Sequence, residues 1–139
     1  VATVDHHVRV VEREVLPVSM KIYIASFFDT RVRLLPIREK LREMGHEITS
    51  TWLDEPSGAS PEEYPAFARR DVKDIRAADL LVLDTLDVTP RGGREVEYGI
   101  AYASGIPLVV VGPRRNVFHY LAGACFPSWE DALGFFRIR

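Results

Sequence analysis

A glutamate, Glu97, stands where a buried apolar segment, 79–86, gives way to a segment rich in small residues, 94–104. The first segment is expected to be a strand and the second a helix, because small side chains let a helix lie close against a sheet. A carboxylate on the first turn of this helix would face the crevice at the carboxyl ends of parallel strands, where open α/β sheets bind ligands. Glu97 is therefore the candidate nucleophile.

Further acids and one tyrosine are expected at the same edge of the sheet. Tyr23 lies on the first strand, Asp71 and Asp74 on the second helix, and Asp84 and Asp87 around the end of the third strand. Carboxylates that converge on one crevice are typical of glycosidic chemistry, in which one attacks the anomeric carbon while an acid assists the departing group. A second interpretation makes Asp84 and Asp87 turn formers.

The elements that must position these residues alternate between strand and helix. The run 107–112 is uninterrupted and apolar, as a parallel strand covered on both faces requires. The pattern predicts a single-domain, flavodoxin-like (Rossmann-like) α/β fold: a three-layer sandwich with a parallel sheet of about five strands. Strands are expected at 21–26, 46–52, 79–86, 107–112 and 124–126, helices at 32–44, 64–78, 94–104 and from 128, and a short helix or turn at 116–121.

Two segments stand apart from this alternation. Residues 1–19 are expected to be an N-terminal extension, either an edge strand or a disordered leader, before a domain that spans 20–139. The segment 54–65 contains Pro56, Pro61 and Pro65 and is expected to be a surface loop. Loops of this length are often functional lids.

Composition narrows the classes of function. The formal net charge of -2 shows no basic bias, so we expect no nucleic acid polymer as a partner. No apolar run approaches the roughly 18 to 20 residues that span a bilayer. The only cysteine, Cys125, lies in an apolar run and is interpreted as a core residue. We therefore expect a cytoplasmic protein without a membrane partner.

Cofactor and metal motifs are missing from the places where they would occur. The first strand is followed by 26–31, which contains no glycine, so the Gly-x-Gly-x-x-Gly site of dinucleotide cofactors and the Walker phosphate loop are both absent. No cluster of histidine and cysteine has metal-ligand spacing. The sequence predicts neither a cofactor nor a metal.

Three segments, in this combination and order, resemble the nucleoside 2-deoxyribosyltransferases and their relatives that hydrolyse nucleoside 5′-monophosphates. They are 22–25 on the first strand, 70–79 before the third strand, and 93–101 with 105–107 after it. The third segment looks like the family's Glu-x-Gly-x-Ala signature, whose glutamate is the nucleophile. The resemblance covers about 20–133.

The resemblance implies a role for each matching residue. Glu97 would form a covalent ester with the sugar, Tyr23 would orient Glu97, and Asp71 would contact the base and help protonate it. Water or a second base would then resolve the ester, which gives a hydrolase or a deoxyribosyltransferase. Asn116 would contact the sugar of the substrate bound in a neighbouring subunit, so at least a homodimer is implied. The other substrate-binding candidates are Ser26, Phe27, Asp74, Arg91 and Gly93.

Arg91 departs from the family pattern, which places an aspartate six residues before the nucleophile. A guanidinium suits phosphate oxygens, and the backbone N–H groups of Gly92 and Gly93 could contribute to the same site. Arg91 therefore favours a nucleotide over a free nucleoside. Three more arginines follow strand ends and could either serve the phosphate or be solvated surface residues: Arg31, Arg114 and Arg115.

Structural and functional alternatives stay open at this point. Glu97 could be a glutamate favoured by the helix dipole, and Tyr23 an ordinary strand aromatic. A TIR-like NAD glycohydrolase and a non-catalytic nucleotide-binding sensor fit the same architecture. Release of nicotinamide from NAD would identify the first, and tight nucleotide binding without turnover the second.

Overall fold

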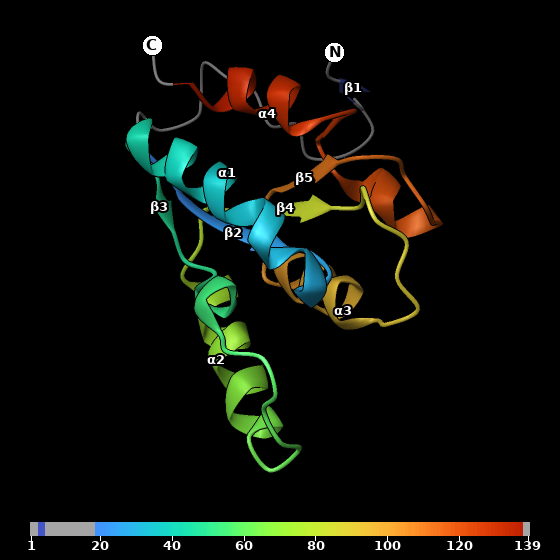
Figure 1. The fold of residues 1–139 in the computed structure, drawn as a ribbon. Coiled ribbons are helices and arrows are strands. Elements are labelled where there is room, and N and C mark those ends of the chain that lie inside the picture. The colour runs from blue at the N-terminus through green and yellow to red at the C-terminus, as the bar shows by residue number, and fades with distance from the viewer. Residues whose placement is uncertain (1–2, 5–18, 138–139) are drawn as a thin grey trace.

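Figure 1 shows the fold, a sheet with helices packed against it. The computed structural model describes residues 3–4 and 19–137. The strands are β1 (Thr3–Val4), β2 (Lys21–Ala25), β3 (Glu47–Ile48), β4 (Leu80–Asp84), β5 (Leu108–Val111) and β6 (Ala124–Phe126). They lie in the order β1-β6-β5-β4-β2-β3, and all neighbours are parallel except β1 and β6. The five parallel strands thus follow the flavodoxin-like order, which confirms the expected fold class.

Four helices form the outer layers of the sandwich. They are α1 (Arg31–Glu43), α2 (Tyr64–Arg76), α3 (Gly93–Ala103) and α4 (Trp129–Phe136). Helix α1 packs beside α4, and α2 packs beside α3. Three short 3-10 helices complete the described elements: η2 (Phe28–Thr30), η3 (Thr51–Asp54) and η4 (Val117–Leu121).

The core lies along the central strands. Every residue of β4 and β5 is buried, because helices cover both faces of a parallel sheet. Each fully buried leucine or valine side chain contributes about 1.5 to 3 kcal/mol relative to an exposed one. The rigid centre fixes the carboxyl ends of the parallel strands at one edge, and the loops that leave this edge carry the site.

The prediction of a strand over 46–52 is wrong beyond its first residues. Strand β3 ends at Ile48, and Thr51 begins the 3-10 helix η3. Side chains replace the missing ladder: the Ile24 N–H donates to Ser50 Oγ at 3.1 Å, and the Trp52 Nε1–H donates to the Ile24 carbonyl at 2.7 Å. The backbone of β2 is thereby satisfied without a longer partner strand.

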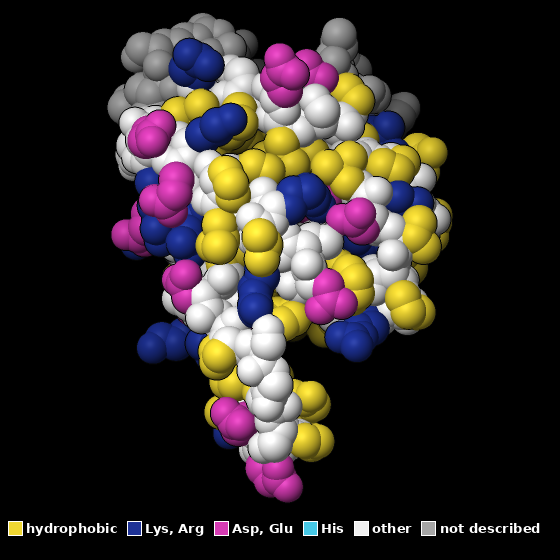
Figure 2. All heavy atoms as spheres, in the orientation of Figure 1, with side chains coloured by type: hydrophobic (Ala, Val, Ile, Leu, Met, Phe, Trp, Pro, Cys, Tyr) yellow, Lys and Arg dark blue, Asp and Glu magenta, His cyan; other side chains and the backbone are white. Residues whose placement is uncertain are grey.

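Helix α2 and the segment before it, 55–63, project beyond the sheet (Figure 1). The projection carries both hydrophobic and acidic side chains on the face shown in Figure 2. Tyr64, the first residue of α2, is 54% exposed. The surface loop expected at 54–65 therefore extends outward from the sheet together with α2 (Figure 1).

Within the expected N-terminal extension, Thr3–Val4 pair with Ala124 and Cys125 as an antiparallel edge strand. The alternating run 8–15 lies outside the described residues. Within the described part of the chain, no helix combines the length and the apolar character needed to cross a bilayer.

Candidate active site

A pocket of about 590 Å³ opens at the carboxyl edge of the sheet, against the projecting helix α2. Its walls come from the loop after β2, from η3 and the segment that follows it, from α2, and from the beginning of α3 with the loop before it. This is the crevice in which the sequence places a ligand. The sequence-predicted residues in its wall are Ser26, Phe27, Asp71, Arg91, Gly93 and Glu97.

Glu97 and Tyr23, the predicted nucleophile and the residue predicted to orient it, are in direct contact. Helix α3 begins at Gly93, one residue earlier than expected, so Glu97 is its fifth residue and opens the second turn instead of closing the first. Tyr23 is a fully buried residue of β2, and its hydroxyl donates a hydrogen bond to Glu97 Oε2. The bond holds one carboxylate oxygen and leaves Oε1 for a reacting atom.

The environment of Glu97 disfavours its charged form. Burial raises the pKa of Glu97 to about 8, and the negative charge of Asp71 acts in the same direction, whereas the hydrogen bond from Tyr23 lowers it. Burial and the Glu97 charge hold the pKa of Tyr23 well above its usual range, so the tyrosine remains a donor. Glu97 therefore gains and loses its proton near neutral pH, which suits a group that takes part in chemistry.

Asp71 lies in the wall from α2 and shares a cation with Glu55. One guanidinium nitrogen of Arg70 is 3.0 Å from Asp71 Oδ1 and 2.6 Å from Glu55 Oε1. Burial raises the pKa of Asp71, and the contact with Arg70 partly offsets that rise. A carboxyl with a raised pKa can hold a proton for a departing base.

The wall also contains residues that the sequence reasoning missed. Tyr64, Phe67, Ala68 and Asp71 recur at the spacing of one helix face and all line the pocket. This spacing was a usable signal, because it continues from Asp71 toward the beginning of the helix. Glu55 offered no signal beyond its place in the long loop.

Two predicted substrate-binding residues lie outside this pocket. Asp74 Oδ2 accepts hydrogen bonds from the backbone N–H and the hydroxyl of Thr51, at 3.2 and 2.6 Å, where η3 begins. Asn116 caps η4, and its Nδ2 donates to Glu95 Oε1 at 2.9 Å. The contact of Asn116 with a neighbouring subunit's substrate stays a prediction.

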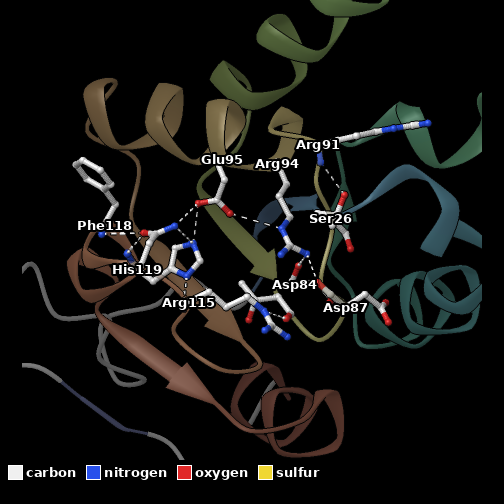
Figure 3. Close-up of polar contacts among 12 residues, drawn as sticks. Ser26, Asp84, Asp87, Arg91, Arg94, Glu95, Arg115, Phe118 and His119 are labelled. Carbon is white, nitrogen blue, oxygen red and sulfur yellow. Dashed lines mark hydrogen bonds and ion pairs between the residues drawn. The ribbon is translucent and has the colours of Figure 1, made fainter.

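Arg91 differs from the other arginines at the strand ends. It is exposed in the pocket wall, 5.8 Å from the ring of Phe27, and Figure 3 shows its side chain extending away from Arg94 and Asp84. The others contribute to the fold: Arg31 donates to Ser57 Oγ at 2.6 Å, Arg114 lies over the ring of Tyr120, and Arg115 donates to the Thr85 carbonyl at 2.7 Å.

Asp84 and Asp87 lie outside the pocket as well. Asp84 is fully buried and accepts hydrogen bonds from Arg33 at 3.0 Å, from the Trp129 indole at 2.7 Å and from the Leu86 N–H at 3.0 Å. Asp87 shares Arg33 with it at 2.9 Å. These contacts join α1, α4 and the loop after β4, so both residues act in the fold. Figure 3 shows their backbone carbonyls, which accept hydrogen bonds from Arg94 at 3.2 and 2.8 Å. Among the described residues no group of histidine, cysteine, aspartate and glutamate could hold a metal ion.

Solved structures with the same fold include two enzymes that act on nucleosides or nucleotides. A 2-deoxyribosyltransferase from the psychrotolerant bacterium Bacillus psychrosaccharolyticus is 24% identical, with a TM-score of 0.69, over 86% of this chain and 97% of that one. The Clostridium botulinum CMP N-glycosidase BcmB is 18% identical, with a TM-score of 0.56, over 82% and 95%. A conserved protein from Enterococcus faecalis V583 is 21% identical, with a TM-score of 0.61, over 85% and 97%.

The family model for nucleoside 2-deoxyribosyltransferases matches residues 22–128, which is well over half of the chain. No curated protein matches this chain. The matched range begins in β2, one residue before Tyr23. It includes α2, with Asp71, and α3, with Glu97. Fold, pocket and family model agree, and the chain belongs to the nucleoside 2-deoxyribosyltransferase family, whose enzymes act on N-glycosidic bonds.

Proposed function

We propose that this enzyme cleaves the N-glycosidic bond of a nucleoside or nucleoside 5′-monophosphate through a covalent ester on Glu97. The observation that carries the proposal is the hydrogen bond from the Tyr23 hydroxyl to Oε2 of a carboxylate in the pocket wall. It orients Glu97 and leaves Oε1 to attack. Nucleophilic catalysis of this kind needs a positioned carboxylate next to an acid that assists the leaving group.

In the first step, Glu97 Oε1 attacks the anomeric carbon of the sugar. A C–O bond forms while the bond from that carbon to the base nitrogen breaks, through an oxocarbenium-like transition state. The electron pair of the broken bond leaves with the base, which takes a proton from Asp71. The raised pKa of Asp71 supports this assignment, because it favours the protonated carboxyl.

In the second step, a nucleophile attacks the same carbon and the ester bond breaks. Its electron pair returns to Glu97, and the proton lost by the nucleophile passes to Asp71, so that both carboxyl groups recover their starting states. Water as the nucleophile makes the enzyme a hydrolase, and a second base makes it a deoxyribosyltransferase.

We also propose that Arg91 binds the 5′-phosphate of a nucleotide. Its guanidinium lies in the pocket wall, and among the described residues no carboxylate pairs with it. A guanidinium can donate two parallel hydrogen bonds to a phosphate. Replacing Arg91 with Ala should lower kcat/KM for monophosphates by about ten- to a hundredfold and leave that for nucleosides nearly unchanged. Equal losses on both substrates would contradict a phosphate contact.

We propose a homodimer or a higher homo-oligomer, held through an apolar surface on α3 and η4. Val96, Val117 and Phe118 are 63%, 73% and 63% exposed, although they are large hydrophobic residues. Asn116 stands beside them on the same segment, which supports its predicted contact with a neighbouring subunit. An active protein that light scattering shows to be monomeric would contradict this proposal.

The cytoplasmic location expected from the lone cysteine stays a prediction.

The deciding experiment measures release of the free base from deoxy- and ribonucleosides, their 5′-monophosphates and NAD, each with and without an acceptor base. Release from a substrate without acceptor identifies a hydrolase, and exchange only with acceptor identifies a transferase. Glu97→Gln should abolish both, whereas Glu43→Gln, which removes an exposed carboxylate at the end of α1 outside the pocket wall, should retain turnover. No release from any nucleoside or monophosphate would contradict the proposed function.

A further inference from the structure

One end of the pocket presents carboxylate oxygens that Arg70 only half satisfies. Arg70 binds Glu55 Oε1 at 2.6 Å and Asp71 Oδ1 at 3.0 Å, and its guanidinium lies 5.0 Å from the centre of the Phe67 ring. The side chains of Glu55 and Asp71 are only 15% and 23% exposed, and both line the pocket. The pair is therefore held in place from behind by one cation.

Each of the two carboxylates keeps a second oxygen without a hydrogen-bond partner among the described residues: Glu55 Oε2 and Asp71 Oδ2. A carboxylate only accepts hydrogen bonds, so Glu55 Oε2 can only accept, whereas Asp71 Oδ2 is reserved for the proton that Asp71 gives to the departing base. The indole N–H of Trp52, a potential donor in the same wall, is already bonded to the Ile24 carbonyl. This end of the pocket thus offers one free acceptor, Glu55 Oε2, and Trp52 supplies no matching side-chain donor.

We infer that this end of the pocket selects a nucleobase that bears an exocyclic amino group, as cytosine and adenine do, over its keto counterpart. The amino group donates a hydrogen bond to the free oxygen of Glu55. A keto oxygen at the same position would face this acceptor and leave it unpaired. A site built to hydrogen-bond one group rejects the analogue that lacks it more strongly than a hydrophobic pocket would.

The neighbouring residues are consistent with a base in this position. Phe67 lies one helical turn before Asp71 on the same face of α2, where an aromatic ring can contact the face of a planar base. Glu97 lines the same pocket from α3, which packs beside α2, so a base at α2 leaves its sugar toward Glu97. The inference rests on the proposed function only for the identity of the ligand as a nucleoside or nucleotide.

The test compares ligands that differ only in this group. Calorimetry at pH 7 would measure the binding of dCMP against dUMP, and of deoxycytidine against deoxyuridine, to the Glu97→Gln variant, which does not turn them over. We expect the cytosine compound to bind at least about tenfold more tightly, the worth of one charge-assisted hydrogen bond. Equal binding, preference for uracil, or no binding in either pair would overturn the inference.

Glu55→Gln provides the matched variant, because its amide can donate to a keto oxygen while keeping the shape of the side chain. We expect this variant to reduce the preference for cytosine at least about fivefold, chiefly by binding the uracil compound better. Glu62→Gln makes the same change on the projection but outside the pocket wall and should leave the preference unchanged. An unaltered preference in Glu55→Gln would overturn the role of Glu55.

Turnover separates this inference from the proposed function. If wild-type enzyme releases uracil faster than cytosine from otherwise identical substrates, the inference fails and the proposed function stands. If it releases no base at all while the binding preference holds, the proposed function fails and the base preference stands.

Discussion

Asp84 and Glu97 are two carboxylates near the same edge of the sheet with opposite surroundings. Asp84 accepts hydrogen bonds from Arg33, from the Trp129 indole and from a backbone N–H, and it is fully buried. Glu97 receives one hydrogen bond, from Tyr23, and burial raises its pKa to about 8. An acid that serves the fold is given donors for its lone pairs, whereas the acid in the pocket is left with an oxygen that a substrate can reach.

Changing Glu97 should produce the largest effect on activity. Glu97→Gln keeps the volume and the contact with Tyr23 but removes the proposed nucleophile, so turnover should fall by at least about a thousandfold. Base release measured by chromatography gives the rate, and thermal unfolding at pH 8 should show stability equal to or above that of the wild type. A variant that still turned over at a tenth of the wild-type rate would refute Glu97 as the nucleophile.

Changing Asp84 should produce the reverse pattern. In Asp84→Asn an amide nitrogen replaces one of two oxygens that both accept hydrogen bonds, so it meets the donors of Arg33, Trp129 or Leu86 whichever way it turns. We expect a loss of about 2 to 3 kcal/mol in the free energy of unfolding. Urea titration measures this loss.

The turnover of folded Asp84→Asn should remain within about threefold of the wild type, because the residue lies outside the pocket wall. A stable but inactive variant would contradict this distinction between Asp84 and Glu97, since it would show that catalysis needs Asp84.

The sequence predicted the parallel sheet and the position of Glu97 because both depend on local patterns. Apolar runs specify buried strands, and the spacing around Glu97 matches a family signature. It could not separate Asp84 from Glu97, because the donors that satisfy Asp84 come from Arg33 and Trp129, 51 and 45 residues away in the chain. Contacts at such separations exist only after the sheet has assembled.

The same reasoning explains what was missed in the pocket. Glu55 becomes informative only through Arg70, which lies 15 residues later on another element. The strand expected to reach Trp52 ended early because side-chain hydrogen bonds replaced its ladder. Local alternation cannot distinguish a residue that pairs through its backbone from one that pairs through its side chain.

Removing the Tyr23 hydroxyl tests the single donor of Glu97. Tyr23→Phe should lower kcat/KM by about ten- to a hundredfold, the value of one hydrogen bond to a charged group. Tyr98→Phe is the matched control, because the Tyr98 hydroxyl donates to the Phe118 carbonyl at 2.8 Å, away from Glu97. It should lose stability without a comparable loss of rate. Equal rates for Tyr23→Phe and the wild type would show that the contact does not serve catalysis.

The prediction that tests the electrostatics most directly is the pH dependence. The attacking form of Glu97 is the carboxylate, so kcat/KM should rise with pH, by up to about tenfold per unit, and level off above about 8. Because the hydrogen bond from Tyr23 lowers the pKa of Glu97, Tyr23→Phe should shift this midpoint to higher pH. A midpoint that did not move would mean that a different group limits the rate.

Stability should change in the opposite direction over the same range. The folded state holds the Glu97 proton up to about pH 8, whereas the unfolded chain releases it near the ordinary value of 4.5. The folded state binds more protons between these limits, so this group lowers the free energy of unfolding as pH rises through them. Glu97→Gln has no such proton, and its stability relative to the wild type should grow from pH 5 to pH 8. A constant difference would show that Glu97 is already ionised at pH 5.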